Sequence, residues 1–412
     1  MPLSESSSSQ SERLPIAIVG AGPYGLSLAA HLASAKLPFR IFGRPLTTWR
    51  EHMPRNMLLK SDGFASSLSA PFAGARLEDF CAAGNLPYRP TGLPVPLTRF
   101  VDYADWFQKR FVPGLEPQDV AAIGKRPNGF DLTLSDGTAV ECRSVVMATG
   151  ISWFSRIPDV LSGLPSPLVS HSADHRTADE FASKRVVVVG AGASAIDTAW
   201  LFAEADAEVR ILSRQQRIVF HNPPGPRSLA KRIRSPQTGI GPGLRSKFFT
   251  SAPLLFRRFP DARRYEIAHG FPPPSPGWFM TEKIEGRVPA LLGWRIRGAR
   301  ANGGEAELAL ESCINGESRT LTADHIVAAT GYSVDLRRVP ILDPALRDSI
   351  AHYRNAPRLS DDFESSVEGL YFVGPAAAPT FGPLMRFVVG AEWAVPRLAR
   401  HLARRARAAA SH

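Results

Sequence analysis

Two short apolar runs, far apart in the chain, are each followed by closely spaced small residues and then by a helical pattern. IAIV at 16–19 leads into GAGPYG at 20–25, and RVVVV at 185–189 leads into GAGASA at 190–195. A short, continuous apolar run bounded by turn residues is typical of a buried strand in a parallel sheet. The sequence therefore predicts two strand–turn–helix units of the same design.

Alternating apolar and polar positions predict two hairpins that end in the same motif. Residues 129–146 alternate on both sides of a Ser-Asp-Gly turn, and the run ends in VVMATG at 145–150. The pattern recurs at 305–327 around an Asn-Gly turn and ends in IVAATGY at 326–332. We expect the two hairpins to mark where the chain leaves the domain of the first unit and later returns to it.

Gly20, Gly22 and Gly25 have the spacing of a dinucleotide-binding turn. In such a turn the first glycine makes the bend, the second lets the backbone approach a pyrophosphate, and the third allows close packing of helix on strand. Free N–H groups at the helix start then hold the negative charge of the phosphates. A purely structural turn is the alternative, and the flanking apolar run and helix make it the weaker one. The second unit has alanine in the third position, an accepted variant.

The expected fold class is therefore α/β, with two Rossmann-like dinucleotide-binding domains, the second inserted into the first. We expect a serine-rich, disordered leader at 1–13, the first domain at 14–155 and 325–412, and the second domain at 156–324. Residues 221–300 break into proline-rich and arginine-rich pieces that such a domain does not need. An excursion of this kind usually covers an active site or binds substrate, and a merely structural insertion is the alternative.

The residue after the second strand of each unit selects the nucleotide. A carboxylate at this place binds a free ribose hydroxyl and repels a 2′-phosphate. The first unit has Gly43 and Arg44 there, so we expect Arg44 and backbone groups to contact the adenosine end. The second unit has Ser213 and Arg214, and an arginine pairs with a 2′-phosphate, which favours NADPH over NADH.

Composition changes this picture little. With 412 residues, 44% of them hydrophobic and 21% charged, the chain has room for two or three globular domains. No apolar run approaches the roughly 20 residues that span a bilayer. The three cysteines (Cys81, Cys142 and Cys313) are odd in number and far apart, which argues against a disulfide framework and against a CxxC redox pair. We expect a reducing compartment, the cytoplasm.

The net charge of +11 is concentrated at 227–264 and in the tail at 397–407. No basic stripe interleaved with aromatic residues is present, so nucleic acid is not an expected partner. The tail could form a cationic helix that rests on a membrane, but a solvated helix with Leu398 and Leu402 packed inward is favoured. The sequence predicts no oligomeric state and no metal site.

Two dinucleotide-binding units in one chain imply two cofactors. The economical pair is a permanently held flavin, FAD, at the first unit and NADPH, which delivers hydride to it, at the second. A disulfide reductase would need a vicinal cysteine pair beside the flavin, and the sequence has none. We therefore expect the electrons to go to oxygen or to an external acceptor.

GAGPYG, GAGASA, the two ATG motifs and the C-terminal GLYFVG and FGPLMRFV segments together resemble the class B flavin monooxygenases. The resemblance extends from residue 14 to residue 402. It implies an enzyme that depends on NADPH and FAD and inserts one atom of O2 into a small metabolite through a C4a-(hydro)peroxyflavin. The protein mainly shields this species from water. The alternatives are a flavin reductase or dehydrogenase that passes electrons to an external acceptor, and a flavoprotein without catalytic activity.

A signature of that superfamily, FxGxxxHSxxYR, is matched in its second half. His171, Ser172 and Arg176 fit, while His175 stands where tyrosine is expected and prolines replace the first aromatic residue and the glycine. The resemblance implies that His171 contacts a cofactor, and a surface histidine without a role is the alternative.

The irregular segment at 49–71 is rich in both apolar and hydrogen-bonding residues, which favours a cofactor-lining role. The candidate catalytic residues are Lys60, Asp62 and Arg386. The candidate cofactor-binding residues, which include Lys60, are Gly20, Gly22, Pro23, Tyr24, Gly25, Arg44, Trp49, Arg50, Leu59, Thr149, Gly150, His171, Gly190, Gly192, Ala193, Ser194, Ser213, Arg214, Thr330, Gly331, Tyr332, Gly374, Pro383 and Leu384.

Overall fold

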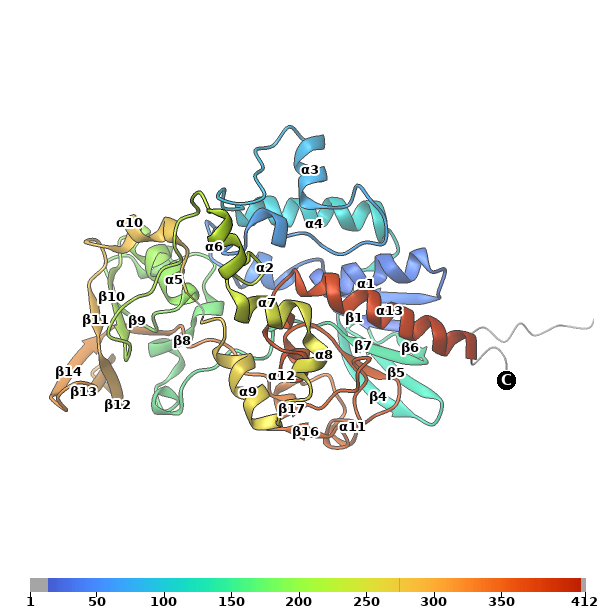
Figure 1. Ribbon diagram of the computed structural model, residues 1–412. Coiled ribbons are helices and arrows are strands. Elements are labelled where there is room, and N and C mark those ends of the chain that lie inside the picture. The colour runs from blue at the N-terminus through green and yellow to red at the C-terminus, as the bar shows by residue number, and fades with distance from the viewer. Residues whose placement is uncertain (1–13, 274, 409–412) are drawn as a thin grey trace, which may run out of the picture.

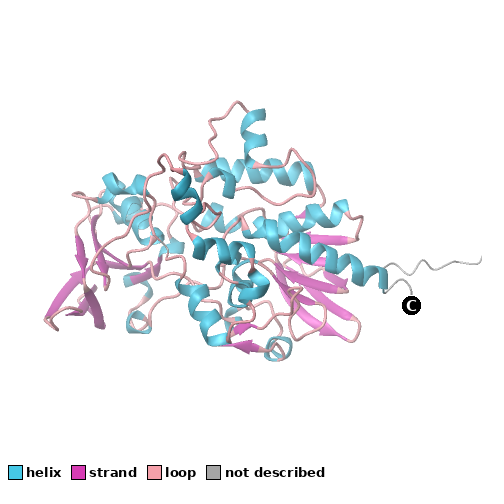
Figure 2. Ribbon diagram, in the orientation of Figure 1, coloured by secondary structure: helices cyan, strands magenta, loops and turns pink. Residues whose placement is uncertain are grey.

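Two five-stranded parallel sheets form the frame of the protein (Figures 1 and 2). The computed structural model describes residues 14–273 and 275–408, so the leader predicted at 1–13 lies outside the described residues. In the first sheet β1 (Ile16–Val19) lies between β2 (Phe39–Phe42) and β7 (Ser144–Met147). The edges are β3 (Leu115–Glu116) beside β2 and β18 (Leu370–Phe372) beside β7.

The second sheet repeats this arrangement. Here β9 (Arg185–Val189) lies between β10 (Glu208–Ser213) and β15 (His325–Ala328). The edges are β11 (Ala290–Leu292) beside β10 and β8 (Val169–His171) beside β15. The predicted α/β fold with two Rossmann-like units is therefore confirmed.

Each predicted hairpin belongs to a separate three-stranded antiparallel sheet. The chain then continues directly into a strand of a parallel sheet. The first such sheet consists of β4 (Val120–Arg126), β5 (Gly129–Leu134) and β6 (Ala139–Cys142), and the second of β12 (Trp294–Asn302), β13 (Glu305–Ser312) and β14 (Ser318–Ala323). Each return strand, predicted as continuous, divides in two, at Arg143 and at Asp324. Burial explains the division, because β6 alternates between exposed and buried residues whereas every residue of β7 is buried.

Helices pack against the parallel sheets, and so do the antiparallel sheets, because β5 contacts β7 and β12, β13 and β14 contact β10, β15 and β9. The long C-terminal helix α13 (Gly390–Ala408) packs along α1 (Pro23–Ser34), and its Leu398 and Leu402 are buried in the core as predicted. The other elements are α2 (Thr47–Glu51), α3 (Leu77–Ala83), α4 (Leu97–Phe111), α5 (Ala193–Glu204), α6 (Leu229–Arg234), α7 (Leu244–Ser251), α8 (Pro253–Phe256), α9 (Asp261–Gly270), α10 (Thr281–Ile284), α11 (Pro344–Asp348), β16 (His352–Tyr353), β17 (Ala356–Pro357) and α12 (Ala378–Phe381). Among the described helices none has the length and apolar character needed to cross a membrane.

Two predicted boundaries differ from the structure. The excursion predicted at 221–300 is shorter, because its last residues form β11 and most of β12. The alternation that begins at Trp294 is interrupted at Gly298, because the pairing of β12 with β13 shifts register between Ile296 and Gly298. The return to the first domain, predicted at 325, follows Ala328, because β15 is a central strand of the second sheet.

The two connections between the domains run side by side. Ser155 and Tyr332 form an isolated antiparallel bridge between them. The Arg156 N–H donates to the Gly331 carbonyl at 3.0 Å, and the Ser333 N–H donates to the Phe154 carbonyl at 2.8 Å. The outgoing and returning chains therefore form a single paired hinge.

A second connection comes from the irregular segment after α2. His52 lies with a ring nitrogen 3.0 Å from the Ala173 carbonyl oxygen, and Lys60 forms an ion pair with Asp197 on α5. Asp197 is almost fully buried, so burial raises the pKa of its carboxyl, and Lys60 opposes that rise. The ion pair thus fixes the second nucleotide-binding helix to the first domain.

Replacing Lys60 with methionine is expected to destabilise the fold by roughly 1–3 kcal/mol, because it leaves a buried carboxylate without its partner. Denaturant unfolding measures this loss. The double variant Lys60→Met/Asp197→Leu should regain most of the stability. Arg300→Met, which removes the exposed pair with Glu307, is the control and should unfold like the native chain. If the double variant regains stability but not turnover, Lys60 or Asp197 has a direct catalytic role.

Candidate functional site

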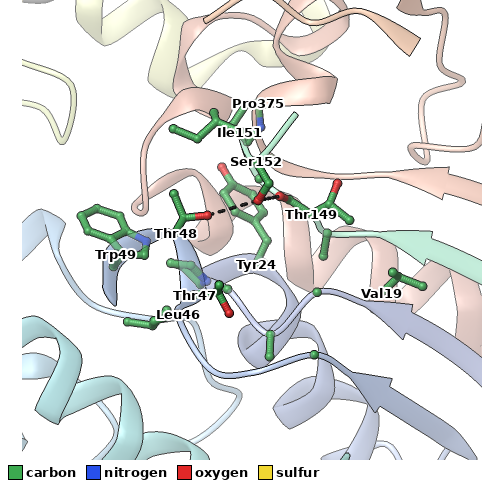
Figure 3. A pocket seen from close by; sticks show the side chains of 18 of the residues that line it. Val19, Tyr24, Leu46, Thr47, Thr48, Trp49, Thr149, Ile151, Ser152 and Pro375 are labelled. Carbon is green, nitrogen blue, oxygen red and sulfur yellow. Dashed lines mark hydrogen bonds between the residues drawn. The ribbon is translucent and has the colours of Figure 1, made fainter. Parts of the chain in front are cut away.

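A cavity of about 500 Å³ opens at the carboxyl edge of the first sheet (Figure 3). Its walls come from the residues that directly follow β1, β2, β7 and β18, because the carboxyl ends of parallel strands meet at one edge. The predicted residues that line it are Gly20, Gly22, Pro23, Tyr24, Arg44, Trp49, Thr149, Gly150, Gly374 and Arg386. The ends of four strands thus supply most of one site, and residues 119–120, 340–341 and 386–388 complete its wall.

The turn after β1 has the geometry of a dinucleotide cradle. Gly20 has a φ of +110°, and a Cβ there would lie 2.6 Å from the Ala148 carbonyl oxygen. A Cβ on Gly25 would lie 1.9 Å from the Gly20 carbonyl oxygen, so helix and strand touch through backbone atoms. A Cβ on Gly22, by contrast, would meet nothing within 4 Å, although Gly22 lines the cavity. Space is therefore kept free at the position where a pyrophosphate approaches.

The start of α1 faces this space with uncapped backbone groups. Gly22 is the N-cap residue, no side chain caps the helix, and the first turn contains no acidic residue. The unpaired N–H groups and the helix dipole give this end a partial positive charge. The end therefore fits a phosphate group.

The C-terminal part of the chain closes the cavity through Tyr24. The Tyr24 hydroxyl donates to the carbonyls of Met385 and Phe387, at 3.1 and 3.0 Å, and burial raises its pKa. A Cβ on Gly390 would lie 2.2 Å from the Tyr24 hydroxyl oxygen, so only glycine fits at the start of α13. Tyr24 thus joins the first turn to the last helix.

Two hydroxyl groups in the cavity were not predicted. Thr48 and Ser152 lie 3.3 Å apart through their side-chain oxygens, and the Ser152 hydroxyl donates to the Thr149 carbonyl at 3.1 Å (Figure 3). Both line the cavity. No motif surrounds either residue, and the only available signal was their position directly after a predicted strand or motif.

Arg386 is a cationic residue in the wall of the cavity. Its guanidinium donates to the carbonyls of Ala268 and Phe271 at 3.1 and 3.2 Å, while burial lowers its pKa. No carboxylate of the described residues forms an ion pair with it. The guanidinium therefore presents an uncompensated positive charge to whatever fills the cavity.

Arg44 lies where the adenosine end was predicted, and it forms an ion pair with Glu51 at 2.5 Å. The other predicted residues of this domain lie outside the lining. Gly25 lies beneath the turn, Arg50 pairs with Asp105, and Lys60 pairs with Asp197. Leu59, Pro383 and Leu384 are buried, and Asp62 accepts hydrogen bonds from Gly92 and Gln237. Burial raises the Asp62 pKa.

The second turn repeats the first with one substitution. Gly190 has a φ of +142°, and a Cβ there would lie 2.6 Å from the Ala329 carbonyl oxygen. Ala195 takes the place of the third glycine and is fully buried. Gly192 is the N-cap of α5, and no side chain caps this helix either. Ala193 and Ser194 begin α5, and the Ser194 hydroxyl lies 2.9 Å from that of Ser172.

His171 is buried and connects the two family motifs of the second domain. Its Nδ1 accepts from the Ala173 N–H, so Nε2 carries the proton and donates to the Gly331 carbonyl at 3.2 Å. Its ring contacts Tyr332 edge-on, and burial lowers its pKa. The alternative of a surface histidine is therefore excluded. Thr330 donates to the Arg156 carbonyl within the paired hinge.

Arg214 lies just beyond the end of β10 and is exposed. None of the described residues pairs with its guanidinium. Ser213, the last residue of β10, accepts from the Gln215 N–H and orients this turn. Arg214 is thus free to bind an anion at the strand end.

Gly22→Ala and Gly25→Ala should have different effects, the first on flavin binding and the second on folding. Gly25→Ala forces a methyl group into a backbone carbonyl and should yield little folded protein. Gly22→Ala should leave the thermal unfolding midpoint close to that of the native chain and reduce flavin retention at least tenfold, measured as flavin absorbance after gel filtration. Equal flavin content in Gly22→Ala and the native chain would contradict the phosphate position.

Comparison of the sequence and the structure with known proteins shows which proteins this chain is similar to. The chain matches the family model of the pyridine nucleotide-disulphide oxidoreductases over residues 14–235. It is 28% identical to indole-3-pyruvate monooxygenase YUCCA1 of Oryza sativa subsp. japonica, over 44% of this chain and 43% of that protein. It is 25% identical to the probable indole-3-pyruvate monooxygenase YUCCA8 of Arabidopsis thaliana, over 76% of this chain and 74% of that protein. Ferredoxin–NADP reductase of Gluconacetobacter diazotrophicus is 23% identical, over 65% of this chain and 62% of that protein. The chain thus spans less than half the length of YUCCA1.

Solved structures share the fold at low identity. The cadaverine monooxygenase DfoA of Erwinia amylovora, bound to FAD, has a TM-score of 0.72 at 16% identity, covering 94% of each chain. The ornithine N-hydroxylase KtzI of Kutzneria sp. 744, with reduced FAD, NADP⁺ and L-ornithine, has a TM-score of 0.72 at 18% identity, covering 95% of this chain and 99% of that one. FAD and an NADP dinucleotide are the cofactors predicted from this sequence. Because the family match takes in both dinucleotide turns, the chain belongs to the pyridine nucleotide-disulphide oxidoreductases, and its predicted resemblance to the class B flavin monooxygenases is confirmed.

Proposed function

We propose that the chain is a flavin-dependent monooxygenase that holds FAD in the cavity of the first domain and binds NADPH at the second turn. The carrying observation is the cavity itself, which joins an uncapped helix start to an apolar wall and has no cysteine among its described lining residues. Cys81 and Cys142 are buried elsewhere, and Cys313 is exposed in the connection between β13 and β14. The named activities of YUCCA1, DfoA and KtzI support the same reaction class.

FAD supplies electron transfer between NADPH and O2, and the residues of this chain bind it and shield it. Gly22 and the start of α1 take the pyrophosphate, and Arg44 takes the adenosine end. Trp49, Ile341 and Val388 form apolar parts of the wall, which exclude water from the reacting groups. Arg386, which lines the same cavity and forms no ion pair with the described residues, would stabilise negative charge on a group bound there.

A second candidate is a reductase that passes electrons to an external acceptor. Its support is the similarity to ferredoxin–NADP reductases, which covers about two thirds of this chain. Both candidates need the same two cofactors, so only the fate of the electrons separates them.

The deciding experiment follows ¹⁸O₂ after anaerobic reduction of the purified protein by NADPH. A monooxygenase incorporates labelled oxygen into one probe of a panel with an amine, a sulfide, a ketone and an aryl 2-oxo acid. A reductase instead returns all its electrons as hydrogen peroxide with every probe, and when ferredoxin is supplied it passes the electrons to ferredoxin. Purified protein that takes up no flavin would contradict both candidates.

Arg214→Ala tests the choice of nucleotide. It should raise the KM for NADPH about 10- to 100-fold, the loss of one charge-assisted pair, and leave the KM for NADH unchanged. Steady-state NAD(P)H oxidation measures both constants. Arg210→Ala, on the exposed face of the same strand, is the control and should change neither. An unaltered NADPH/NADH ratio in Arg214→Ala would exclude a 2′-phosphate contact.

A further inference from the structure

The segment at 209–260 is uniformly cationic. It contains eleven lysine and arginine residues and no aspartate or glutamate. The surplus of this one stretch therefore equals the net charge of +11 of the whole chain. Helices α6, α7 and α8 lie within this segment, and α9 follows it. In Figure 1 these helices run down the middle of the view, between the two parallel sheets. Neither proposed cofactor explains so large a surplus, because only Arg214 of this segment lies at a predicted nucleotide contact.

The same segment exposes large apolar side chains. Most of the exposed large apolar residues in the described part of the chain lie in it, namely Val219, Leu229, Ile233, Leu244, Leu255 and Phe259. Leu229 and Ile233 are 75% and 76% exposed. Single exposed apolar side chains are normal on a protein surface, whereas their concentration in one segment is typical of an interaction surface.

Helix α6 combines both properties. Leu229 and Ile233 are four residues apart and share one face of the helix. Arg232 lies beside that face, whereas Lys231 and Arg234 are turned further from it and add to the charge of the same short helix. None of the described residues forms an ion pair with these three cations. The helix is anchored rather than loose, because Ser228 caps it and Arg227 donates to Gln237 at 3.0 Å. The chain beyond it is bound to α7 through the Gly243 N–H and the Pro236 carbonyl at 2.9 Å.

We propose that α6, together with the exposed Leu244 of α7 and Leu255 of α8, here called the α6 face, binds reversibly to the surface of an anionic lipid bilayer. Unpaired cations attract anionic headgroups, and each apolar side chain enters the boundary between headgroups and acyl chains. A fluid surface accepts side chains that project singly from several elements, without a matching shape. Two apolar residues on a short helix give a shallow contact that salt reverses.

Other occupants fit less well. Nucleic acid uses aromatic side chains for stacking, whereas the α6 face presents leucine and isoleucine. A second copy of the chain would place one cationic surface against another, at a Coulombic cost. None of the residues of the α6 face lines the cofactor cavity, so the inference does not depend on the proposed reaction.

The test is co-sedimentation of the full chain with phosphatidylcholine vesicles, with and without about 30% phosphatidylglycerol. We expect binding to the anionic vesicles alone, reversed by salt. Leu229→Glu/Ile233→Glu should lower the bound fraction at least tenfold. Ile314→Glu is the matched control, because Ile314 is 73% exposed in the connection between β13 and β14, outside the cationic segment, and it should bind like the native chain. Lys231→Glu/Arg232→Glu should also lose binding, and Arg319→Glu should not.

Three results would overturn the inference. The first is no binding to anionic vesicles at low salt, and the second is equal binding by Leu229→Glu/Ile233→Glu and Ile314→Glu. The third is a dimer in sedimentation equilibrium that Leu229→Glu/Ile233→Glu dissociates, which would assign the face to a second copy. All substituted positions are exposed, so flavin content and thermal unfolding should match the native chain and verify that each variant is folded.

Discussion

The structure depends on one backbone contact, the approach of α1 to the turn after β1. The absence of a side chain at Gly25 lets the helix rest on the Gly20 carbonyl, where a Cβ would lie at 1.9 Å. This approach aims the uncapped N–H groups of α1 into the cavity, and it positions Tyr24 to hold the C-terminal segment. Cofactor binding and the attachment of the C-terminal segment therefore both require that residue 25 has no side chain. The second unit relaxes it slightly, since Ala195 fits where the first unit needs glycine.

The two domains resemble each other beyond their turns. Both sheets have the same order around their first strand, and both are fed by a three-stranded antiparallel sheet. The inserted domain is attached by the paired hinge at Ser155 and Tyr332 and by the ion pair of Lys60 with Asp197. One of these attachments is covalent and the other is electrostatic. Apolar contacts add to both, because Phe249, Phe256 and Ala268 of the segment at 221–300 are buried in the hydrophobic core of the first domain.

Most of the fold could be predicted from the sequence, because apolar runs, glycine spacing and hairpin turns are local signals. The site could be predicted where it follows a strand directly, as at Gly22, Arg44 and Thr149. Lys60 shows the limit: its sequence neighbourhood gives no sign that its partner is Asp197, 137 residues away. Thr48 and Ser152 were missed because a single hydroxyl has no pattern, and β12 was missed because a register shift at Gly298 interrupts its alternation.

The late position of β18 and the start of α13 has a consequence for biosynthesis. The cavity needs Gly374 and the segment around Arg386, which are translated after the whole second domain. A nascent chain that ends before residue 369 has the first turn but neither the edge strand β18 nor the carbonyls that bind Tyr24. The flavin compartment is therefore completed last, when the inserted domain has already left the ribosome and its own sheet can form. Cofactor loading is a step of the finished polypeptide.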